Sequence, residues 1–227
     1  MTGIAQNLQA IGERLKAARG VTLLAVSKGQ SVERIREAAA AGQKAFGENY
    51  VQEAVEKMDA LAGRVGEERA SALAWHLIGP LQSNKTKIAA ARFDWVHTIE
   101  SEKIARRLSA QRPAGMAALN VLIQVNVSGE ASKSGVAPQE VAGLARGILT
   151  LPNVRLRGLM AIPEPGADAA RYRELKNLYE ELKGEFRFDT LSVGMSDDMD
   201  TAIAEGATMV RVGTAIFGPR QTIRPAA

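Results

Sequence analysis

TLLAVSKGQS, residues 22–31, opens as a short apolar run and ends in a lysine followed by a polar turn. A run of this length and composition is typical of a buried β-strand. In a doubly wound open sheet the first strand leads into a glycine-rich dinucleotide-binding turn, and SKGQS lacks that pattern. The stretch therefore favours another arrangement of parallel strands. It also leaves an ammonium group at the end of a hydrophobic strand.

Seven more β-rich runs follow the first one along the chain. They are short, and turn or helical residues separate them, as expected of strands in an alternating fold. The eight predicted strands are Thr22–Ser27, Lys44–Gly47, Ala74–Ile78, Trp95–Ile99, Leu119–Val127, Val154–Ala161, Thr190–Val193 and Met209–Val212.

Helical segments lie between the predicted strands. The clearest is Ala169–Phe186, in which apolar side chains recur at helical spacing and form one stripe. The chain also opens with an amphipathic segment, residues 1–19, which we expect to form a helix that packs on the rest of the fold. The other predicted helices are Ser31–Ala41, Glu48–Ala60, Asn84–Ala91, Ser101–Ala110, Pro138–Leu149 and Asp198–Glu205.

This strict alternation predicts an α/β fold with a parallel sheet, because parallel neighbours need a long connection. Eight strand–helix units predict a closed (β/α)8 TIM barrel preceded by the N-terminal helix, with a doubly wound sheet as the alternative. We find no linker or shift in composition, so we expect residues 1–227 to form a single domain. The Gly/Ser-rich segment VSGEASKSG, residues 127–135, is expected to be one loop after a strand.

Composition and charge narrow the classes of function. Hydrophobic residues make up 46% and charged residues 24%, as in soluble globular proteins. The formal charge of +4 comes from 29 basic and 25 acidic residues mixed along the chain, and aromatic residues are only 4%, so we expect no nucleic-acid or membrane partner.

Other absences in the sequence exclude further classes of site. The chain has no cysteine, which excludes disulfides and thiolate chemistry, and only two histidines without a nearby carboxylate cluster, so no metal site is expected. We find neither a signal peptide nor an apolar segment long enough to span a bilayer, so the expected compartment is the cytoplasm.

Lys28 is the first candidate for chemistry. Residues two apart on a strand share a face, so Leu24, Val26 and Lys28 lie on the same side. If that side faces the barrel axis, the amine enters the mouth of the barrel, where active residues of such folds lie. Apolar surroundings lower the pKa of a lysine, and a neutral amine can attack a carbonyl to form a Schiff base. The alternative is a lysine that extends from the strand into solvent.

The last two predicted strands end in motifs that suit an anion. LSVGMSDDM, residues 191–199, passes through Gly194 to Ser196, a favourable N-cap residue. MVRVGTAIFG, residues 209–218, places Gly213 and Thr214 where a short helix would begin. Backbone N–H groups and hydroxyls at the loops after strands seven and eight often bind phosphate in barrels, although each motif alone could be ordinary capping.

Arg211 lies within the last predicted strand, between two valines. A buried arginine stays charged and needs an acceptor, which could be a structural carboxylate or a ligand. A lysine that forms Schiff bases, a phosphate site and a fixed cation together describe a pocket for pyridoxal 5′-phosphate (PLP).

Seven motifs in order along the chain resemble those of the PLP homeostasis protein family, whose barrel is similar to the N-terminal domain of alanine racemase. They are LLAVSK (23–28), FGENY (46–50), WHLIGPLQSNK (75–85), SKSG (132–135), GLMAIP (158–163), SVGMSDDM (192–199) and VRVGTAIFG (210–218). In SKGQS the chain departs from the family, which often has threonine, lysine and proline after the reactive lysine.

The resemblance implies a role for each motif residue. Lys28 would carry the PLP aldehyde, and Arg211 would face the pyridine nitrogen. The phosphate would be held by Ser196, Gly213 and Thr214, and the pocket would be lined further by Asn49, Met160 and His76.

The sequence favours a carrier over an enzyme. PLP enzymes work best when a carboxylate keeps the pyridine nitrogen protonated, and the guanidinium of Arg211 cannot do this because it is itself permanently protonated. This limits the chemistry without excluding it, since the racemase that the barrel resembles also has an arginine at this place. The racemase that the barrel resembles adds a second domain and a tyrosine from a partner subunit, for which we expect no counterpart here. Of the three tyrosines, only Tyr50 is expected near the pocket, since Tyr172 and Tyr179 lie on the apolar face of a predicted outer helix.

We therefore expect a monomeric, non-catalytic PLP-binding protein that takes part in intracellular vitamin B6 homeostasis and delivers PLP to PLP-dependent apoenzymes. Two enzymatic alternatives are a weak PLP-dependent amino-acid racemase and a class I aldolase that uses Lys28 without PLP.

Overall fold

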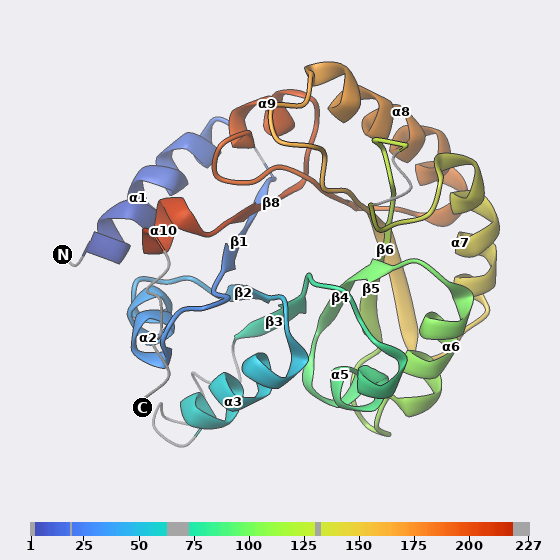
Figure 1. Ribbon diagram of the computed structural model, residues 1–227, viewed down its shortest axis with the longest axis horizontal. Helices are drawn as coiled ribbons and strands as arrows, with labels where there is room; N and C mark the ends of the chain where they lie inside the picture. The colour runs from blue at the N-terminus through green and yellow to red at the C-terminus, as the bar shows by residue number, and fades with distance from the viewer. Residues whose placement is uncertain (1–2, 19, 63–72, 130–132, 220–227) are drawn as a thin grey trace.

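The computed structural model describes residues 3–18, 20–62, 73–129 and 133–219, and its strands form one closed barrel (Figure 1). The strands are parallel and follow one another around the barrel in chain order, and β8 pairs with β1 to close it. They are β1 (Thr22–Val26), β2 (Ala45–Glu48), β3 (Ala74–Leu77), β4 (Trp95–Ile99), β5 (Leu119–Gln124), β6 (Val154–Met160), β7 (Thr190–Ser192) and β8 (Met209–Val212).

The helices surround the barrel and connect its strands (Figure 1). They are α1 (Gly3–Lys16), α2 (Val32–Ala40), α3 (Val51–Ala62), α5 (Thr86–Arg92), α6 (Glu102–Gln111), α7 (Val141–Leu149), α8 (Ala169–Phe186), α9 (Met199–Ala204) and α10 (Thr214–Phe217), with short 3-10 helices η1 (Ser83–Lys85) and η2 (Pro138–Glu140).

The predicted (β/α)8 barrel is confirmed, but several element ends differ from the expectation. Glu48 is the last residue of β2 and pairs with Leu77 of β3, so α3 begins at Val51 rather than at Glu48. β5 ends at Gln124 instead of Val127: the Val125 N–H still donates to the Met160 carbonyl oxygen at 2.8 Å, but among the described residues Val125 forms just an isolated bridge with Val136.

The N-terminal helix α1 packs against the end of the chain's last unit. Ile4, Leu8 and Ile11 on one face of α1 are buried. Asn7 donates from Nδ2 to the carbonyl oxygen of Ile216 at 2.9 Å, and α1 lies beside α10 (Figure 1). The packing expected for this segment is therefore observed over Gly3–Lys16, while residues 1, 2 and 19 lie outside the described residues.

Apolar side chains fill two layers. The larger one lies between the strands and the surrounding helices, as expected for a barrel whose strands are covered on the outside. The smaller one lies inside the barrel, where Leu24, Ile78 and Met209 pack together with Val26 and Ala45. The alternation along β1 therefore turns Leu24 and Val26 toward the barrel axis.

β6 contains a bulge that requires a glycine. The register between β5 and β6 shifts by one residue at Arg157, and Gly158 follows with φ +150°. A Cβ on Gly158 would come within 1.9 Å of the Thr190 carbonyl oxygen, so the close approach of β7 requires glycine there. The guanidinium of Arg157 lies over the ring of Trp95, 4.8 Å from its centroid.

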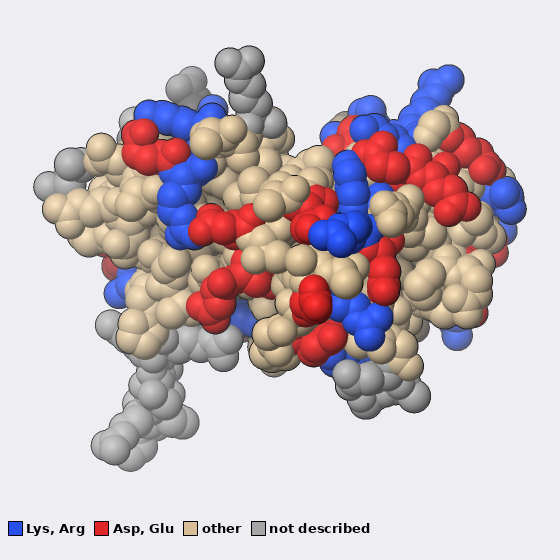
Figure 2. All heavy atoms as spheres, turned by 90° about the horizontal axis from the view of Figure 1, so that it is seen from above, with Lys and Arg blue, Asp and Glu red and all other residues tan. Residues whose placement is uncertain are grey.

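Surface charges of both signs are intermixed on the face seen in Figure 2. Ion pairs also join neighbouring helices: Arg14 of α1 binds Asp200 of α9, and Arg173 of α8 binds Glu205 at the end of α9, both at 2.8 Å. Within the described ranges, none of the helices combines the length and the apolar character needed to cross a membrane.

Candidate functional site

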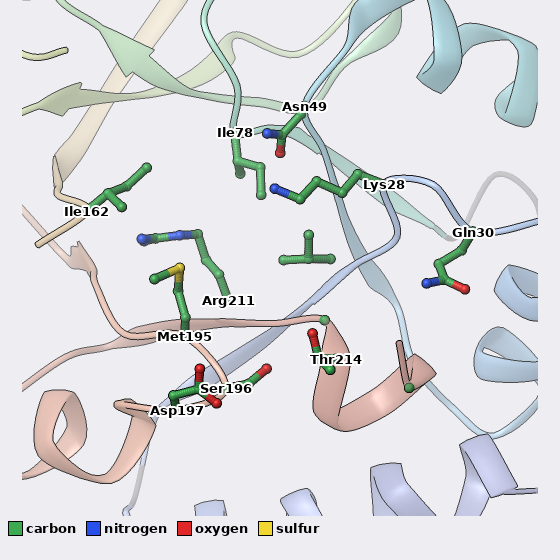
Figure 3. A pocket seen from close by; sticks show the side chains of 13 residues that line it. Lys28, Gln30, Asn49, Ile78, Ile162, Met195, Ser196, Asp197, Arg211 and Thr214 are labelled. Carbon is green, nitrogen blue, oxygen red and sulfur yellow. The ribbon is translucent and has the colours of Figure 1, made fainter. Parts of the chain in front are cut away.

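A cavity of about 220 Å³ opens at the carboxyl ends of the strands (Figure 3). This is the end at which (β/α)8 barrels place their active residues, and a cavity below about 300 Å³ suits a compact ligand such as one substituted ring. The described residues that line it are Val26, Lys28, Gln30, Asn49, Ile78, Ile162, Met195, Ser196, Asp197, Arg211, Gly213, Thr214 and Gly218.

A second hollow of about 620 Å³ lies at the opposite end of the barrel, under α1. Its walls come from α1, the start of β1 and the turn after α2, and its described lining residues are apolar or carry amides. It is larger, but the lining residues that the structure describes include no charged group to hold a polar ligand. The smaller cavity is therefore the candidate site.

Lys28 lies just beyond the end of β1, in the turn that leads to α2, and is half-buried. Its side chain extends into the cavity between Asn49 and Ile78 (Figure 3). The turn follows the inward-facing Val26, so the strand's alternation carries on to the lysine. The amine therefore reaches the barrel mouth, which is where a carbonyl compound bound in the cavity would meet it.

The loops after β7 and β8 supply the hydroxyl groups of the cavity. Thr214 begins α10 with Gly213 as its N-cap, as the sequence predicts. Ser196 lies across from it, and its Oγ accepts a hydrogen bond from the Ala215 N–H at 3.4 Å. With the positively charged Arg211 in the same cavity, these groups favour an anion such as phosphate beside Ser196 and Thr214.

The expectation that Ser196 caps the helix after β7 is wrong. α9 begins at Met199 with Asp198 as its N-cap residue, and Ser196 lies within the preceding turn. Asp198 instead fixes this turn: its Oδ1 accepts from the Met195 N–H, and its Oδ2 accepts from the Tyr172 hydroxyl at 2.5 Å. Ser196 is thereby left to face the cavity.

Tyr172 and Tyr179 lie on the buried face of α8 as predicted, whereas Tyr50 differs from the expectation. Tyr50 is 66% exposed and is not among the described residues that line the cavity. Tyr172 of α8 is buried, and its hydroxyl reaches the loop that carries Ser196 through Asp198. Burial, followed by the bond to Asp198, raises the pKa of Tyr172, so this hydroxyl stays protonated at neutral pH.

Arg211 projects from β8 into the cavity floor and is 4% exposed (Figure 3). Its NH1 donates to the carbonyl and hydroxyl oxygens of Ser192 at 2.8 and 2.9 Å, and its NH2 donates to the carbonyl oxygen of Ala161 at 2.9 Å. The observed acceptors are thus neutral oxygens, not the structural carboxylate considered from the sequence. Burial lowers the pKa of Arg211 to about 10, which still leaves it protonated at neutral pH.

His76 lies below the cavity rather than in its wall. It is 2% exposed, and its Nδ1 lies 2.9 Å from Nε2 of His97, whose Nδ1 lies 3.4 Å from the Ser192 hydroxyl. Burial lowers the pKa of His76 to about 3 and that of His97 well below its usual value, so both imidazoles are neutral. They extend the hydrogen bonds of Arg211 down the barrel axis.

Of the two other residues expected in the pocket wall, Asn49 lines the cavity and Met160 does not. Asn49 follows β2, and its side chain points toward the cavity near Lys28 (Figure 3). Met160 is the last residue of β6 and is fully buried; it is not among the described lining residues. Six of the eight residues expected at the site therefore line one cavity, and His76 and Met160 do not.

Sequence reasoning missed several other lining residues. Most of them stand inside the motifs already singled out, but an apolar residue near a strand end gives no sign that it contacts a ligand. The missed residues include Gln30, Ile78, Ile162, Met195 and Asp197. Among the residues with described positions, no group of histidine, aspartate and glutamate side chains is arranged to hold a metal ion.

Comparison with known proteins gives full-length matches. A sequence model of the alanine racemase N-terminal domain matches residues 2–221. The pyridoxal phosphate homeostasis protein of Vibrio cholerae is 52% identical, with the whole of both chains covered. The protein of the same name from Escherichia coli is 49% identical and covers 97% of this chain and 98% of its own.

Solved structures agree with the sequence matches. PipY of Synechococcus elongatus, solved without PLP, is 37% identical with a TM-score of 0.85 and covers 95% of this chain and all of its own. Its structure with PLP bound gives a TM-score of 0.81. Alanine racemase of Corynebacterium glutamicum, 19% identical with a TM-score of 0.72, shares the fold over 99% of this chain and 63% of its own.

Proposed function

The chain belongs to the pyridoxal phosphate homeostasis protein family, and we propose that it binds PLP covalently on Lys28 as a non-catalytic carrier. In this proposal residues 1–227 form a single PLP-binding domain that works in the cytoplasm as a monomer. It takes part in intracellular PLP homeostasis by holding the cofactor and releasing it to PLP-dependent apoenzymes.

One observation carries the proposal: an amine, a guanidinium and two hydroxyls from distant parts of the chain converge on one compact cavity. They belong to Lys28, Arg211, Ser196 and Thr214 (Figure 3). This donor set fits PLP, which combines an aldehyde, a pyridine nitrogen and a phosphate around one ring. PLP-bound PipY, a relative of 37% identity, supports the same assignment.

When bound, PLP supplies an aldehyde that an amine can capture reversibly. In capturing it, the Lys28 Nζ forms a carbon–nitrogen double bond, and the aldehyde oxygen leaves as water. Ser196, Thr214 and the Gly213 backbone would hold the phosphate, Arg211 would face the pyridine nitrogen, and Asn49 would lie beside the ring. Met160 and His76 would support this site from below, since both are buried in the barrel.

Arg211 also supports the carrier over the enzyme. A guanidinium that stays protonated cannot keep a proton on the pyridine nitrogen, which limits the electron withdrawal that PLP enzymes use. Racemisation further requires proton transfer on both faces of a substrate carbon. Besides Lys28, the titratable side chains in the described lining are Asp197 and Arg211, and the hydroxyl of Tyr172 is bound to Asp198.

The proposal is tested by adding PLP to the protein, reducing with borohydride and locating the modified residue by mass spectrometry. We expect the label on Lys28, and a Lys28→Ala variant that is colourless after dialysis. A label on another lysine would refute the assignment.

The alternative, a weak amino-acid racemase, is supported by the shared fold with alanine racemase. It is tested by incubating the PLP-loaded protein with alanine in deuterated water. The carrier leaves the α-proton in place, whereas a racemase exchanges it for deuterium.

A further inference from the structure

A largely buried cluster of charged side chains forms hydrogen bonds with Ser27 and Gly29, the residues before and after Lys28. We call it the Lys57 cluster; it consists of Glu48, Glu53 and Lys57. The Nζ of Lys57 donates to the Ser27 carbonyl oxygen at 2.7 Å, to Glu48 Oε1 at 2.8 Å and to Glu53 Oε1 at 2.6 Å. These three bonds use every hydrogen of the ammonium group, whose side chain is only 8% exposed.

The two carboxylates of the Lys57 cluster reach the same turn. Glu48, at the end of β2, accepts from the Ser27 hydroxyl at 2.6 Å. Glu53, in the first turn of α3, accepts from the Gly29 N–H at 2.6 Å. Gly29 has φ +69°, a left-handed conformation that lets the chain turn sharply after the lysine. The residue before Lys28 is thus held at its hydroxyl and carbonyl, and the residue after it is held at its N–H.

Stability alone does not account for the Lys57 cluster. Glu48 is fully buried, its Oε2 lacks a hydrogen-bond partner among the described residues, and burial raises the pKa of its carboxyl group. Desolvation of buried ion pairs often cancels their attraction, so apolar side chains of similar volume would join β2 to α3 at least as well. What apolar side chains could not do is bind the polar groups of the turn at Ser27 and Gly29.

We propose that Glu48, Glu53 and Lys57 are positioning residues that fix the turn around Lys28, so that its Nζ meets the aldehyde carbon of the bound cofactor. This inference rests on the proposed function of Lys28. The groups assigned to the phosphate and the pyridine nitrogen are not part of the cluster. Loosening the turn should therefore slow formation of the carbon–nitrogen bond while leaving binding of the ring and phosphate intact.

The test replaces Glu53 with alanine and uses Glu56→Ala as the matched control. Both residues lie on α3, but Glu56 is exposed and contacts only the neighbouring Gln52 in the described hydrogen bonds. In Glu53→Ala the buried Lys57 and Glu48 remain as a balanced pair. The two ligands compared are PLP and pyridoxine 5′-phosphate, which carries an alcohol in place of the aldehyde and cannot form the bond.

We expect Glu53→Ala to form the PLP-dependent visible absorbance about tenfold more slowly than Glu56→Ala, since misplacement of a reacting group by about 1 Å can cost up to about 100-fold. Its affinity for pyridoxine 5′-phosphate should stay within about twofold, the size of effect expected of groups that do not contact the ligand. Glu53→Gln should restore the rate, because its amide oxygen can still accept from the Gly29 N–H. Ser27→Ala, which removes the bond to Glu48, should slow the same step and serves if Glu53→Ala does not fold.

Two results would overturn the inference: equal rates in the Glu53 and Glu56 variants, or equal losses for both ligands, which would indicate a general structural defect. Borohydride reduction of the wild-type protein separates these results from a failure of the proposed function. Label on Lys28 with equal rates refutes the positioning role alone, whereas label on another lysine refutes the assignment of Lys28 and the positioning role together.

Discussion

Replacing His76 with asparagine should make the folded protein less sensitive to acid. His76 is buried inside the barrel, where its pKa is lowered to about 3. When the chain unfolds, the imidazole returns to a pKa of about 6.5 and takes up a proton. Acid therefore favours the unfolded state over the interval between these two values. Asparagine places an amide near the position of Nδ1, so it can keep a hydrogen bond to His97.

The expected magnitude follows from these two pKa values. Between pH 8 and pH 5 the folded state leaves His76 neutral while the unfolded state protonates it, which lowers the free energy of unfolding by about 2 kcal/mol. His97, whose pKa is also lowered by burial, adds a loss of the same sign in both proteins. Glu48 acts in the opposite direction, because its raised pKa favours the folded state as the pH falls, but it does so equally in both proteins.

The measurement is urea unfolding of the PLP-free protein at pH 8 and pH 5, followed by circular dichroism. His76→Asn loses the stacking of His76 on Trp95 and should be less stable at both pH values. Its loss between pH 8 and pH 5 should nevertheless be about 2 kcal/mol smaller than that of the wild type. Equal losses in the two proteins would show that His76 is not held neutral, and the reasoning from burial would fail.

Three other substitutions have expected outcomes. Gly158→Ala should destabilise the protein by about 3 kcal/mol or more in urea unfolding, because the new Cβ would lie 1.9 Å from the Thr190 carbonyl oxygen; a change below about 1 kcal/mol would contradict the bulge geometry. Tyr172→Phe removes the hydroxyl that binds Asp198 and should lower the free energy of unfolding by about 1–2 kcal/mol. It should also weaken PLP binding, because the turn that carries Ser196 loosens. Unchanged PLP binding would show that this turn does not contribute to the site. Ser196→Ala should weaken PLP and pyridoxine 5′-phosphate alike by about tenfold in titrations, and a loss confined to PLP would argue against a phosphate contact.

The barrel could be predicted from the sequence because eight short β-rich runs alternate with helical segments, and these connections are long enough for parallel pairing. The sequence also predicted the part of the site that strand ends determine. Lys28 follows from the alternation along β1, and Thr214 follows from the short helix after β8. These placements depend on local chain geometry, which neighbouring residues set.

Other parts of the site depend on which side chain reaches a polar group, and local pattern does not reveal this. Ser196 has the properties of an N-cap residue, but Asp198 takes the contacts that fix the turn. Glu48 was expected at the start of a helix, so its pairing with Lys57 was not foreseen. Part of the Lys57 cluster could have been predicted, because Glu53 and Lys57 are four residues apart and such a pair forms an ion pair on one face of a helix.

The site is assembled across the seam where the barrel closes. Lys28 follows β1, whereas Arg211 belongs to β8 and Thr214 to α10. The backbones of β1 and β8 pair directly as parallel strands. A growing chain cannot complete this pocket until β8 and α10 have been synthesised. A ligand that contacts residues on both sides of this seam stabilises the closed barrel, because its binding free energy is lost when β1 and β8 separate.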